Sequence, residues 1–402
     1  MKMYLDSMLM HRAGTGEWTG WWRSFSQQDL SATQREPFDF DGWAREWGSF
    51  AEGRALPFGV QGARFTAARL PSPFCAEFGG PLAGKHVVPY AGGRFGQCAA
   101  IPPLVPALNT SATKQLEFWR ALGVNLTRKG WLSADRTGVG TLWYDYAFDE
   151  PGSHESTTHG AGWDVIVQRA LLLRSAEPRF RVFVSTDVQH ARNHSATTPR
   201  GRVPGFNRTE SLIDIWCASV LMMDVKPGAS GWPAPDSERG CGWQGEHFEA
   251  PGDHRSDFSP AISSGAEVWQ YAACSVVGDC VRAGCFHNGK DNCKQGWPAP
   301  FVVDNPAVNN RMMGWANFVY NVSGELSPSW NAVAGAKDVW QSNFFHNNGE
   351  GAMWYPGTPA VVGGKTHIPI ASMRMKIVRD GVQGKAPKPS TELAERLQWH
   401  SP

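Results

Sequence analysis

Hydrophobic and polar positions follow two different periods along the chain, one typical of helices and one typical of strands. Apolar residues recur at helical spacing in four segments, which are 1–12, 38–50, 112–122 and 163–174. Gly123 provides a stop signal for the third helix. Runs rich in β-branched and aromatic residues predict strands at 141–148, 181–186, 212–216, 267–271 and 317–320. Because helical and strand segments alternate, the pattern predicts βα units with a parallel sheet.

The order of these segments favours a barrel over a dinucleotide-binding fold, because no G-x-G-x-x-G motif follows a strand. We predict an α/β domain over residues 1–382 that forms a TIM-like (β/α)8 barrel. Residues 226–300 are rich in Gly, Pro, Cys and charged residues, which predicts a Cys/Gly-rich loop insertion around the strand at 267–271. Residues 383–402 are polar and are expected to form a tail.

The strand predicted at 141–148 leads directly into two neighbouring carboxylates, Asp149 and Glu150, and then into Pro151. Regular alternation predicts that the even-numbered positions from 142 to 148 pack against helices. The odd-numbered positions from 143 to 149 are then expected to point into the barrel. Because Pro151 cannot continue the ladder, both carboxylates are expected at the carboxyl end of the strand, where barrel enzymes hold catalytic groups.

Two neighbouring carboxylates suit one variant of glycosidic cleavage. The reaction requires a proton donor at the leaving oxygen and a second group that stabilises positive charge at the anomeric carbon. In the substrate-assisted variant, the sugar's own 2-acetamido oxygen attacks that carbon, one carboxylate orients the amide, and the other moves the proton. Burial beside a like charge keeps that proton bound near neutral pH. An Asp-Glu-Pro sequence is also typical of a helix start, and this alternative stays open.

Composition narrows the class of function. The 19 Trp residues offer flat apolar surfaces that suit sugar rings, although a single Trp is more often part of a core. A formal net charge of +1 gives no reason to expect a nucleic-acid partner. No apolar run approaches the roughly 18 residues that span a bilayer, so no membrane span is expected. Because no metal-ligand spacing and no G-x-S-x-G elbow is present, we expect neither a metal site nor a serine triad.

Cysteines and glycosylation sequons favour an oxidising compartment. The chain has eight cysteines, five of them between positions 241 and 293, and none forms a C-x-x-C pair, which favours disulfides over a zinc site. Five sequons agree with this, at Asn109, Asn125, Asn193, Asn207 and Asn321. We therefore expect a disulfide-bonded glycoprotein in the extracellular space or in the lumen of the secretory pathway, although the sequence opens without a signal peptide.

Four segments together resemble glycoside hydrolase family 123 and its relatives. They correspond to the family's catalytic strand, its Trp-Tyr strand, its N-G-D-G-x-x-x-Y-P-G signature and its final helix. In this chain they are YDYAFDEP at 144–151, EVWQY at 267–271, NGEGAMWYPG at 348–357 and PIASMRMKIVRDG at 369–381. They occur in the order found in the family, and the resemblance extends over residues 1–382.

The resemblance implies a glycosidase of the β-N-acetylhexosaminidase type, with N-acetylgalactosaminides favoured. It implies retention through an oxazolinium-type intermediate, without a metal or an organic cofactor. The implied substrate is an oligosaccharide or a glycoconjugate. By position, it makes Glu150 the general acid/base and Asp149 the residue that holds the acetamido group. It also implies a set of candidates for the sugar subsite, which are Trp269, Tyr271, Tyr320, Asn348, Glu350 and Tyr355. For Arg374 a structural, salt-bridged role is favoured.

Departures from the family pattern leave alternatives open. Family members have a β-sandwich before the barrel, and this chain shows no such segment. The barrel strand expected before residues 1–12 is also not found. We therefore expect an incomplete barrel, and whether it is active stays an open question. The first alternative is a catalytically inactive carbohydrate-binding barrel. A second is a glycosidase for sugars without an acetamido group that uses Asp187 or Asp214 as the partner carboxylate. For both aspartates, a buried capping role is favoured.

Overall fold

A computed structural model shows how these segments assemble around one parallel sheet. It describes residues 7, 40–56, 64–71, 111–132, 140–149, 151, 161–186, 197–198, 201–202, 209–219, 223–225, 252–271, 286–287, 290–291, 303, 306–326, 338, 349 and 352–383. Within these residues, the main sheet has six strands, and every neighbouring pair is parallel. In spatial order they are β1 (Ala67–Arg69), β2 (Leu142–Asp149), β3 (Arg181–Ser185), β6 (Ile215–Ser219), β9 (Glu267–Tyr271) and β12 (Gly324–Leu326).

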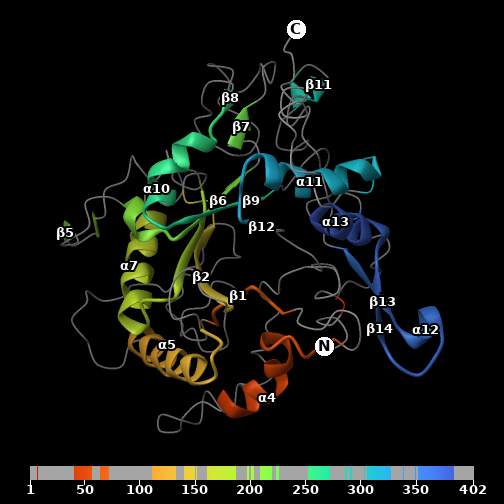
Figure 1. Ribbon diagram of the computed structural model, residues 1–402, viewed down its shortest axis with the longest axis horizontal. Helices are drawn as coiled ribbons and strands as arrows, with labels where there is room; N and C mark the ends of the chain where they lie inside the picture. Colours follow the sequence, from red (N-terminus) through yellow and green to blue (C-terminus); the bar gives the residue numbers. More distant parts are fainter. Residues whose placement is uncertain are drawn as a thin grey trace.

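The helices lie on one face of this sheet. Parallel strands that follow chain order have no reversal point, so right-handed crossovers place every connection on the same face. The helices accordingly surround the outer face, and the sheet curls into half of an α/β barrel (Figure 1). They are α4 (Phe40–Ala51), α5 (Ser111–Arg128), α7 (Ala161–Ala176), η1 (Thr209–Leu212), η2 (Arg255–Phe258), α10 (Ser259–Ser263) and α11 (Ala307–Val319).

Apolar side chains pack on both faces of the sheet. On the outer face, Trp143, Val182 and Trp216 pack with Trp43 of α4 and Phe118 of α5 in the main core. The inner face carries a smaller and mainly aromatic cluster, which we call the inner cluster. Its buried members are Tyr144, Phe183, Ile215, Cys217, Trp269 and Tyr271.

The C-terminal part of the chain adds a hairpin and a helix beside the sheet (Figure 1). Strands β13 (Trp354–Gly357) and β14 (Ile368–Ala371) are antiparallel, and helix α12 (Pro359–Val362) lies in their connection. Helix α13 (Met373–Gln383) follows and packs on α11. The Trp354 Nε1 donates to the Ser7 Oγ at 2.8 Å, so the N-terminal part of the chain meets this hairpin. Three short antiparallel ribbons complete the described structure: β4 (Thr197–Thr198) with β5 (Gly201–Arg202), β7 (Asp224–Val225) with β8 (Gly252–Asp253), and β10 (Phe286–His287) with β11 (Lys290–Asp291).

Several predicted elements are confirmed within a few residues at each end. The helices at 38–50 and 163–174 are α4 and α7, and the strands at 141–148, 181–186 and 267–271 are β2, β3 and β9. The strand predicted at 212–216 lies three residues later, as β6, because 209–212 form a 3-10 turn. The segment expected to be one helix at 369–381 divides at Ser372, whose Oγ accepts the Met375 N–H and caps α13.

The prediction that Gly123 ends a helix is wrong. Helix α5 continues to Arg128, because Leu126 extends the buried stripe that Phe118 and Leu122 begin. Gly130, with a φ of +69°, lies just beyond the helix in the left-handed conformation that glycine adopts at helix ends.

The strand predicted at 317–320 is also wrong, because these residues form the end of helix α11. Asn310 and Met313 are buried at helical spacing, and Asn317 continues this stripe one turn later. Conversely, β1 and β12 were not predicted, because each has only three residues and neither shows a usable alternation. Of the helix predicted at 1–12, only the helical Ser7 is described.

The six-stranded half-barrel agrees with an incomplete α/β barrel. Closure into a (β/α)8 barrel and the domain limits at 1–382 stay predictions. Within the predicted insertion at 226–300, the described part forms β8, η2, α10, β9 and the ribbon of β10 with β11. Of the eight cysteines, only Cys217 lies within the described residues, and the predicted tail lies outside them beyond Gln383.

Candidate active site

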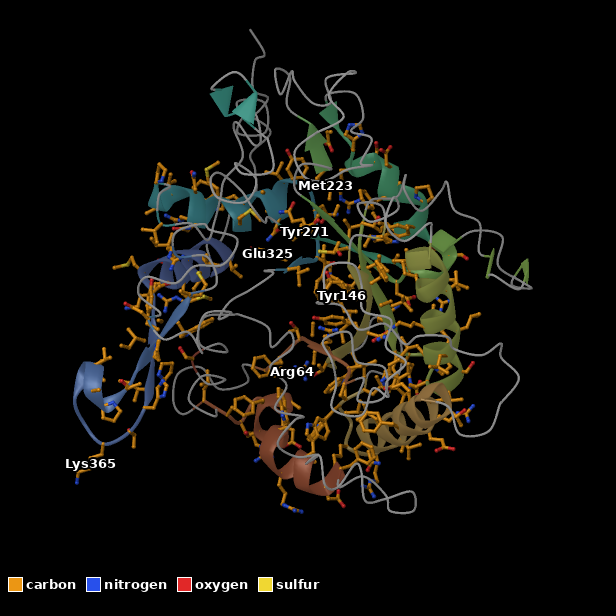
Figure 2. All side chains as sticks on the ribbon, turned by 180° about the vertical axis from the view of Figure 1, so that it is seen from behind. Arg64, Tyr146, Met223, Tyr271, Glu325 and Lys365 are labelled. Atoms are coloured by element: carbon orange, nitrogen blue, oxygen red, sulfur yellow. The ribbon has the colours of Figure 1, made fainter. Side chains whose placement is uncertain are left out.

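The carboxyl ends of the six strands meet at one edge of the half-barrel, where barrel enzymes hold their catalytic groups. The inner face below this edge is aromatic. The rings of Tyr144, Phe183 and Trp269 contact one another with centroids 5.2 to 5.6 Å apart, and Tyr146 meets Phe183 at 4.7 Å. Figure 2 shows Tyr146 and Tyr271 near the middle of the molecule, between the helices on either side.

The predicted faces of β2 are wrong over most of the strand. Tyr144 belongs to the inner cluster, and Tyr146 packs against it. Trp143 instead packs against the Trp43 ring of α4 on the outer face, and the Asp145 carboxylate accepts hydrogen bonds from Arg169 of α7. Alternation fixes which residues share a face, whereas the partners available on the helices decide which face is outer.

A β-bulge in β2 changes this alternation before the strand ends. Tyr146 pairs with Phe183 and Phe148 pairs with Val184, so Ala147 has no register partner. Ala147 and Phe148 both belong to the main core of the outer face. The next residue, Asp149, therefore pairs with Ser185 rather than with an outer-face position.

Ser185 lies on the inner face, because its Oγ is 2.9 Å from the Tyr146 hydroxyl oxygen. The backbone register thus pairs Asp149 with an inner-face residue of β3, while the inward direction of its side chain stays a prediction. The side chain of Asp149 and the whole of Glu150 lie outside the described residues.

The same register relates Asp149 to the aromatic strand β9. Val184 pairs with Trp216, so Ser185 is level with Cys217, which pairs with Trp269. Asp149 and Trp269 therefore occupy one layer of the sheet, separated by the two small residues Ser185 and Cys217.

Trp269 and Tyr271 lie together at the carboxyl end of β9, and both are nearly buried, at 7% and 5% exposed. The Trp269 ring lies across Gly324 of β12, where an added Cβ would lie 2.5 Å from the indole. Its Nε1 donates to the Glu267 Oε2 at 3.0 Å. The structure therefore brings these two candidates together, within a packed aromatic layer.

Two inner-face polar residues were missed by the sequence analysis. The Arg69 guanidinium lies over the Tyr146 ring, 5.3 Å from its centroid, and Ser185 contacts the same tyrosine through its hydroxyl. Neither carries a sequence signal, since β1 has three residues and β3 is buried at all five positions.

The remaining candidates for the sugar subsite lie in the C-terminal part of the chain. Tyr355 lies half-buried on β13, and Tyr320 is the C-cap of α11 rather than a strand residue. Asn348 and Glu350 lie outside the described residues.

Arg374 of α13 holds the turn that contains these positions. Its Nη2 donates to the Ala352 carbonyl at 2.8 Å and to the Tyr355 hydroxyl at 3.4 Å, and its Nη1 donates to the Gly349 carbonyl. Gly349 has a φ of +80°, and an added Cβ would lie 2.7 Å from the Arg374 guanidinium. Arg374 is only 7% exposed, and these hydrogen bonds give it a structural role, whereas the salt bridge expected for it stays a prediction.

Other carboxylates with possible catalytic character lie on the outer face. Asp214, 3% exposed, accepts the Val182 N–H at 2.9 Å and contacts Arg174 and Arg181, which confirms its capping role. Asp187 lies outside the described residues.

Burial raises the pKa of Glu325 to about 7, a value typical of a general acid. Glu325 pairs in register with Gln270, however, and is bound by Asn317 of α11, so it faces the helices rather than the inner cluster.

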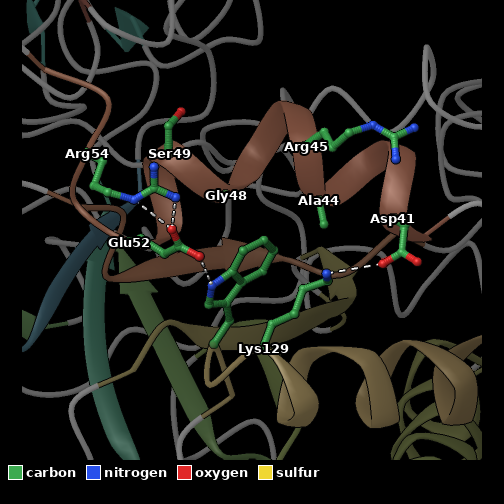
Figure 3. Close-up of a pocket in the computed structure, with 9 residues that line it drawn as sticks. Asp41, Ala44, Arg45, Gly48, Ser49, Glu52, Arg54 and Lys129 are labelled. Atoms are coloured by element: carbon green, nitrogen blue, oxygen red, sulfur yellow. Dashed lines mark hydrogen bonds and ion pairs between the residues drawn. The ribbon is translucent and has the colours of Figure 1, made fainter.

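A hollow of 540 Å³ lies beside α4 and is lined by residues such as Arg45, Glu52 and Lys129 (Figure 3). It is formed by α4 and the residues that follow α5, which lead toward the start of β2. Its charges are largely paired, with Lys129 3.2 Å from Asp41, and Glu52 bound both by Arg54 and by the Trp131 Nε1. Because barrel enzymes keep stabilising contacts at this end, we assign it no catalytic role.

The described part of the chain shows neither a metal site nor a membrane-spanning helix. There, His, Cys, Asp and Glu side chains form no group of three or more that could hold a metal ion. Among the described helices, none combines the length and apolar character that crossing a bilayer requires.

Comparisons with known proteins give a match among solved structures but none among family models or curated proteins. No protein-family model matches the chain, and no curated protein matches it. Among solved structures, the chain is similar to a family 123 glycoside hydrolase from Clostridium perfringens studied for glycolipid glycan hydrolysis, with a TM-score of 0.36 and 12% identity. The match covers 73% of this chain and 36% of that chain, so this chain spans about a third of the length of that enzyme.

Proposed function

We propose that the chain is a glycoside hydrolase that cleaves β-linked N-acetylhexosaminides, with N-acetylgalactosaminides as the favoured substrates. The proposal rests on four motifs that occur in the order of family 123, and on the position of the carboxylate pair. Glu150 acts as the general acid/base, and Asp149 holds the acetamido group. The substrate is an oligosaccharide or a glycoconjugate.

The observation that supports this proposal most is the β-bulge at Ala147. Without the bulge, Asp149 would share the outer face with Asp145, which is bound by Arg169. With it, Asp149 is paired with Ser185 at the carboxyl end of the sheet and level with Trp269. Bulges next to active sites serve to redirect a side chain in this way.

The proposed reaction proceeds in two steps with retention of configuration. Glu150 gives its proton to the leaving oxygen while the acetamido oxygen attacks the anomeric carbon, and Asp149 orients the amide and stabilises its developing positive charge. Glu150 then removes a proton from water, which attacks the anomeric carbon and reopens the ring. We assign Trp269, Tyr271, Tyr320, Asn348, Glu350 and Tyr355 to the sugar subsite as part of this proposal.

Hydrolysis of an aryl N-acetyl-β-galactosaminide tests the proposal directly. We expect Glu150→Gln and Asp149→Asn each to lower kcat/KM by about 100-fold or more, which is the usual contribution of a positioned acid or of charge stabilisation. Glu117→Gln, an exposed change on α5, is the matched control and should keep the wild-type rate. Equal rates for wild type and Glu150→Gln would contradict the proposal.

A catalytically inactive carbohydrate-binding barrel is the second candidate. It is favoured by the packed state of Trp269 and Tyr271, which suits a stable binding surface as well as a catalytic one. Calorimetric titration with N-acetylgalactosamine distinguishes the two. Binding by a wild-type chain that hydrolyses no aryl glycoside would favour the second candidate.

We also propose that the protein acts in an oxidising compartment, on the basis of its even number of cysteines and its five sequons. Mass spectrometry of protein secreted from a eukaryotic host, with and without thiol reduction, tests this. We expect linked cysteine pairs and occupied sequons, and fully reduced thiols would contradict it.

A further inference from the structure

Three polar side chains join the sheet edge to α11 on the outer face. The Gln270 Nε2 donates to the Asn317 Oδ1 at 2.5 Å, and the Asn317 Nδ2 donates to the Glu325 Oε2 at 3.1 Å. Gln270 of β9 and Glu325 of β12 are register partners on neighbouring strands. The helix residue Asn317 therefore bridges the two strands.

Two oxygen atoms in this group are buried without a hydrogen-bond partner, the Gln270 Oε1 and the Glu325 Oε1. Both are acceptors as long as Glu325 is ionised, so neither can satisfy the other. A buried acceptor without a donor costs roughly 1–3 kcal/mol. The three side chains are therefore one hydrogen short of a complete set of hydrogen bonds. Among them, only the Glu325 carboxylate can bind an additional proton.

We propose that Glu325 is held as a neutral carboxylic acid whose Oε1–H donates to the Gln270 Oε1, closing a ring of three hydrogen bonds that fastens α11 to the edge of the sheet. The ring runs from Gln270 to Asn317, from Asn317 to Glu325, and from Glu325 back to Gln270. When the proton is released to solvent, the third bond is lost and a charge is left buried. Glu325 is thus a pH-sensitive switch, which we infer from these contacts and not from the proposed hydrolase activity.

The surroundings of Glu325 support a neutral acid. Burial raises its pKa to about 7, more than the Asn317 hydrogen bond lowers it. Among the described residues, no neighbouring charge contributes to the shift in the pKa of Glu325. The ionisable groups on the elements around it are Glu267 of β9, His254, Arg255 and Asp257 at η2, Arg311 of α11, and Arg374, Lys376, Arg379 and Asp380 of α13.

Three of these ionisable groups contact residues other than Glu325. Glu267 accepts from Trp269 and Ser323, Arg255 donates to the Tyr320 and Asn321 carbonyls, and Arg311 lies over the Trp315 ring. Within the part of the chain that the structure describes, a proton is therefore the available means of neutralising Glu325.

The switch extends beyond α11 itself. Helix α13 packs on α11, and its Arg374 holds the turn at Gly349 and Ala352. Loosening α11 is expected to loosen α13 and this turn. The proton on Glu325 is thus coupled to a segment that lies outside the sheet.

The direction of the pH dependence follows from the two pKa values. The folded chain binds the proton up to about pH 7, whereas the unfolded chain releases it near the ordinary value of 4.5. Because the folded state binds more protons between these values, stability is greatest below pH 4.5 and falls as the pH rises to 7. The loss corresponds to roughly a 300-fold change in the unfolding equilibrium constant.

Infrared spectroscopy and unfolding of the full chain test the proposal together. We expect wild type at pH 6 to show the carbonyl stretch of a neutral carboxylic acid that disappears above pH 7 and is absent from Glu325→Gln. In Glu325→Gln, the amide can complete the ring at every pH, so the fall in stability between pH 5 and 8 should be smaller than in wild type by about two orders of magnitude in equilibrium constant. Glu117→Gln is the matched control and should follow wild type in both measurements.

Two results would overturn the switch. One is the same carboxylic acid band in wild type and in Glu325→Gln. The other is an identical loss of stability with pH in these two proteins. If Glu325→Gln does not fold, the infrared titration of wild type decides alone, and a spectrum without a carboxylic acid band that titrates near pH 7 rejects the proposal.

Discussion

Asp145 of β2 and Arg169 of α7 form an ion pair joined by two hydrogen bonds, and each side chain is 1% exposed. The Arg169 Nε lies 2.9 Å from the Asp145 Oδ2. Charges removed from water to this degree are retained only when they are paired. The pair thereby fixes Asp145 on the outer face of β2. Because side chains alternate along a strand, its neighbours Tyr144 and Tyr146 then lie on the inner face.

Breaking this pair is expected to destabilise the fold strongly. We expect Asp145→Asn and Arg169→Met each to lower the free energy of unfolding by about 3–5 kcal/mol, because each leaves an uncompensated buried charge or a buried polar group without its partner. Urea unfolding followed by circular dichroism measures the loss. Asp380→Asn, which removes the exposed pair with Arg379, is the control and should cost less than about 1 kcal/mol. Similar losses in Asp145→Asn and Asp380→Asn would show that the buried pair does not hold β2.

A second expectation concerns the crossing of α11 and α13. An added Cβ on Gly314 would lie 2.6 Å from the carbonyl carbon of Gly381, so the two backbones touch at this point. Gly314→Ala is therefore expected to lower stability by about 1–3 kcal/mol, even though alanine is the better helix former. Thermal unfolding measures the effect.

Gly123→Ala in α5 is the matched control for this crossing. The three atoms nearest to its added Cβ would be the Cβ, Cγ and Oε2 of Glu177, at 3.1 to 3.3 Å, and none of them belongs to a backbone. The expected result is a change near zero or a small gain in stability. A gain in stability for Gly314→Ala as well would mean that the helices do not cross this closely.

The elements that could be predicted from the sequence are those whose own residues carry the signal. In α4, Trp43 and Trp47 mark the buried face, and in β9 the run Glu267–Tyr271 is rich in strand-forming residues. The orientation of β2 could not be predicted, because it depends on Arg169, which lies 24 positions away from Asp145. Tyr320 was misplaced for the same kind of reason, since the helical stripe of α11 is completed by contacts with the sheet.

Of the candidate site, only the sequence motif and its place at a strand end could be predicted. The carboxyl-end position of Asp149 follows from Pro151, but its inner-face register comes from the unpaired Ala147, and a bulge leaves no mark in a strand this apolar. Arg69 and Ser185 join the inner face through short or wholly buried strands, where alternation gives no information.

Arg374 offers a test of the turn that contains three of the proposed sugar contacts. We expect Arg374→Met to cost about 2–4 kcal/mol, since it removes a buried guanidinium that donates to two carbonyls and a hydroxyl. Arg374→Lys should rescue little, because an ammonium cannot reproduce the planar fork. Hydrogen exchange at 352–357 measures the loosening of the turn. On the proposed function, KM rises more than kcat falls, whereas full stability in Arg374→Lys would contradict this role.

The two proposed catalytic roles can be separated by the basicity of the leaving group. A general acid matters most when the departing oxygen is strongly basic, so the loss in Glu150→Gln should shrink from about 1,000-fold for an alkyl or sugar leaving group toward little loss for a dinitrophenyl leaving group. Asp149 acts on the acetamido group instead, so the loss in Asp149→Asn should be similar for all leaving groups. The measurement is kcat/KM across a series of N-acetyl-β-galactosaminides. A parallel dependence in both variants would contradict the division of roles, and a steeper one in Asp149→Asn would exchange them.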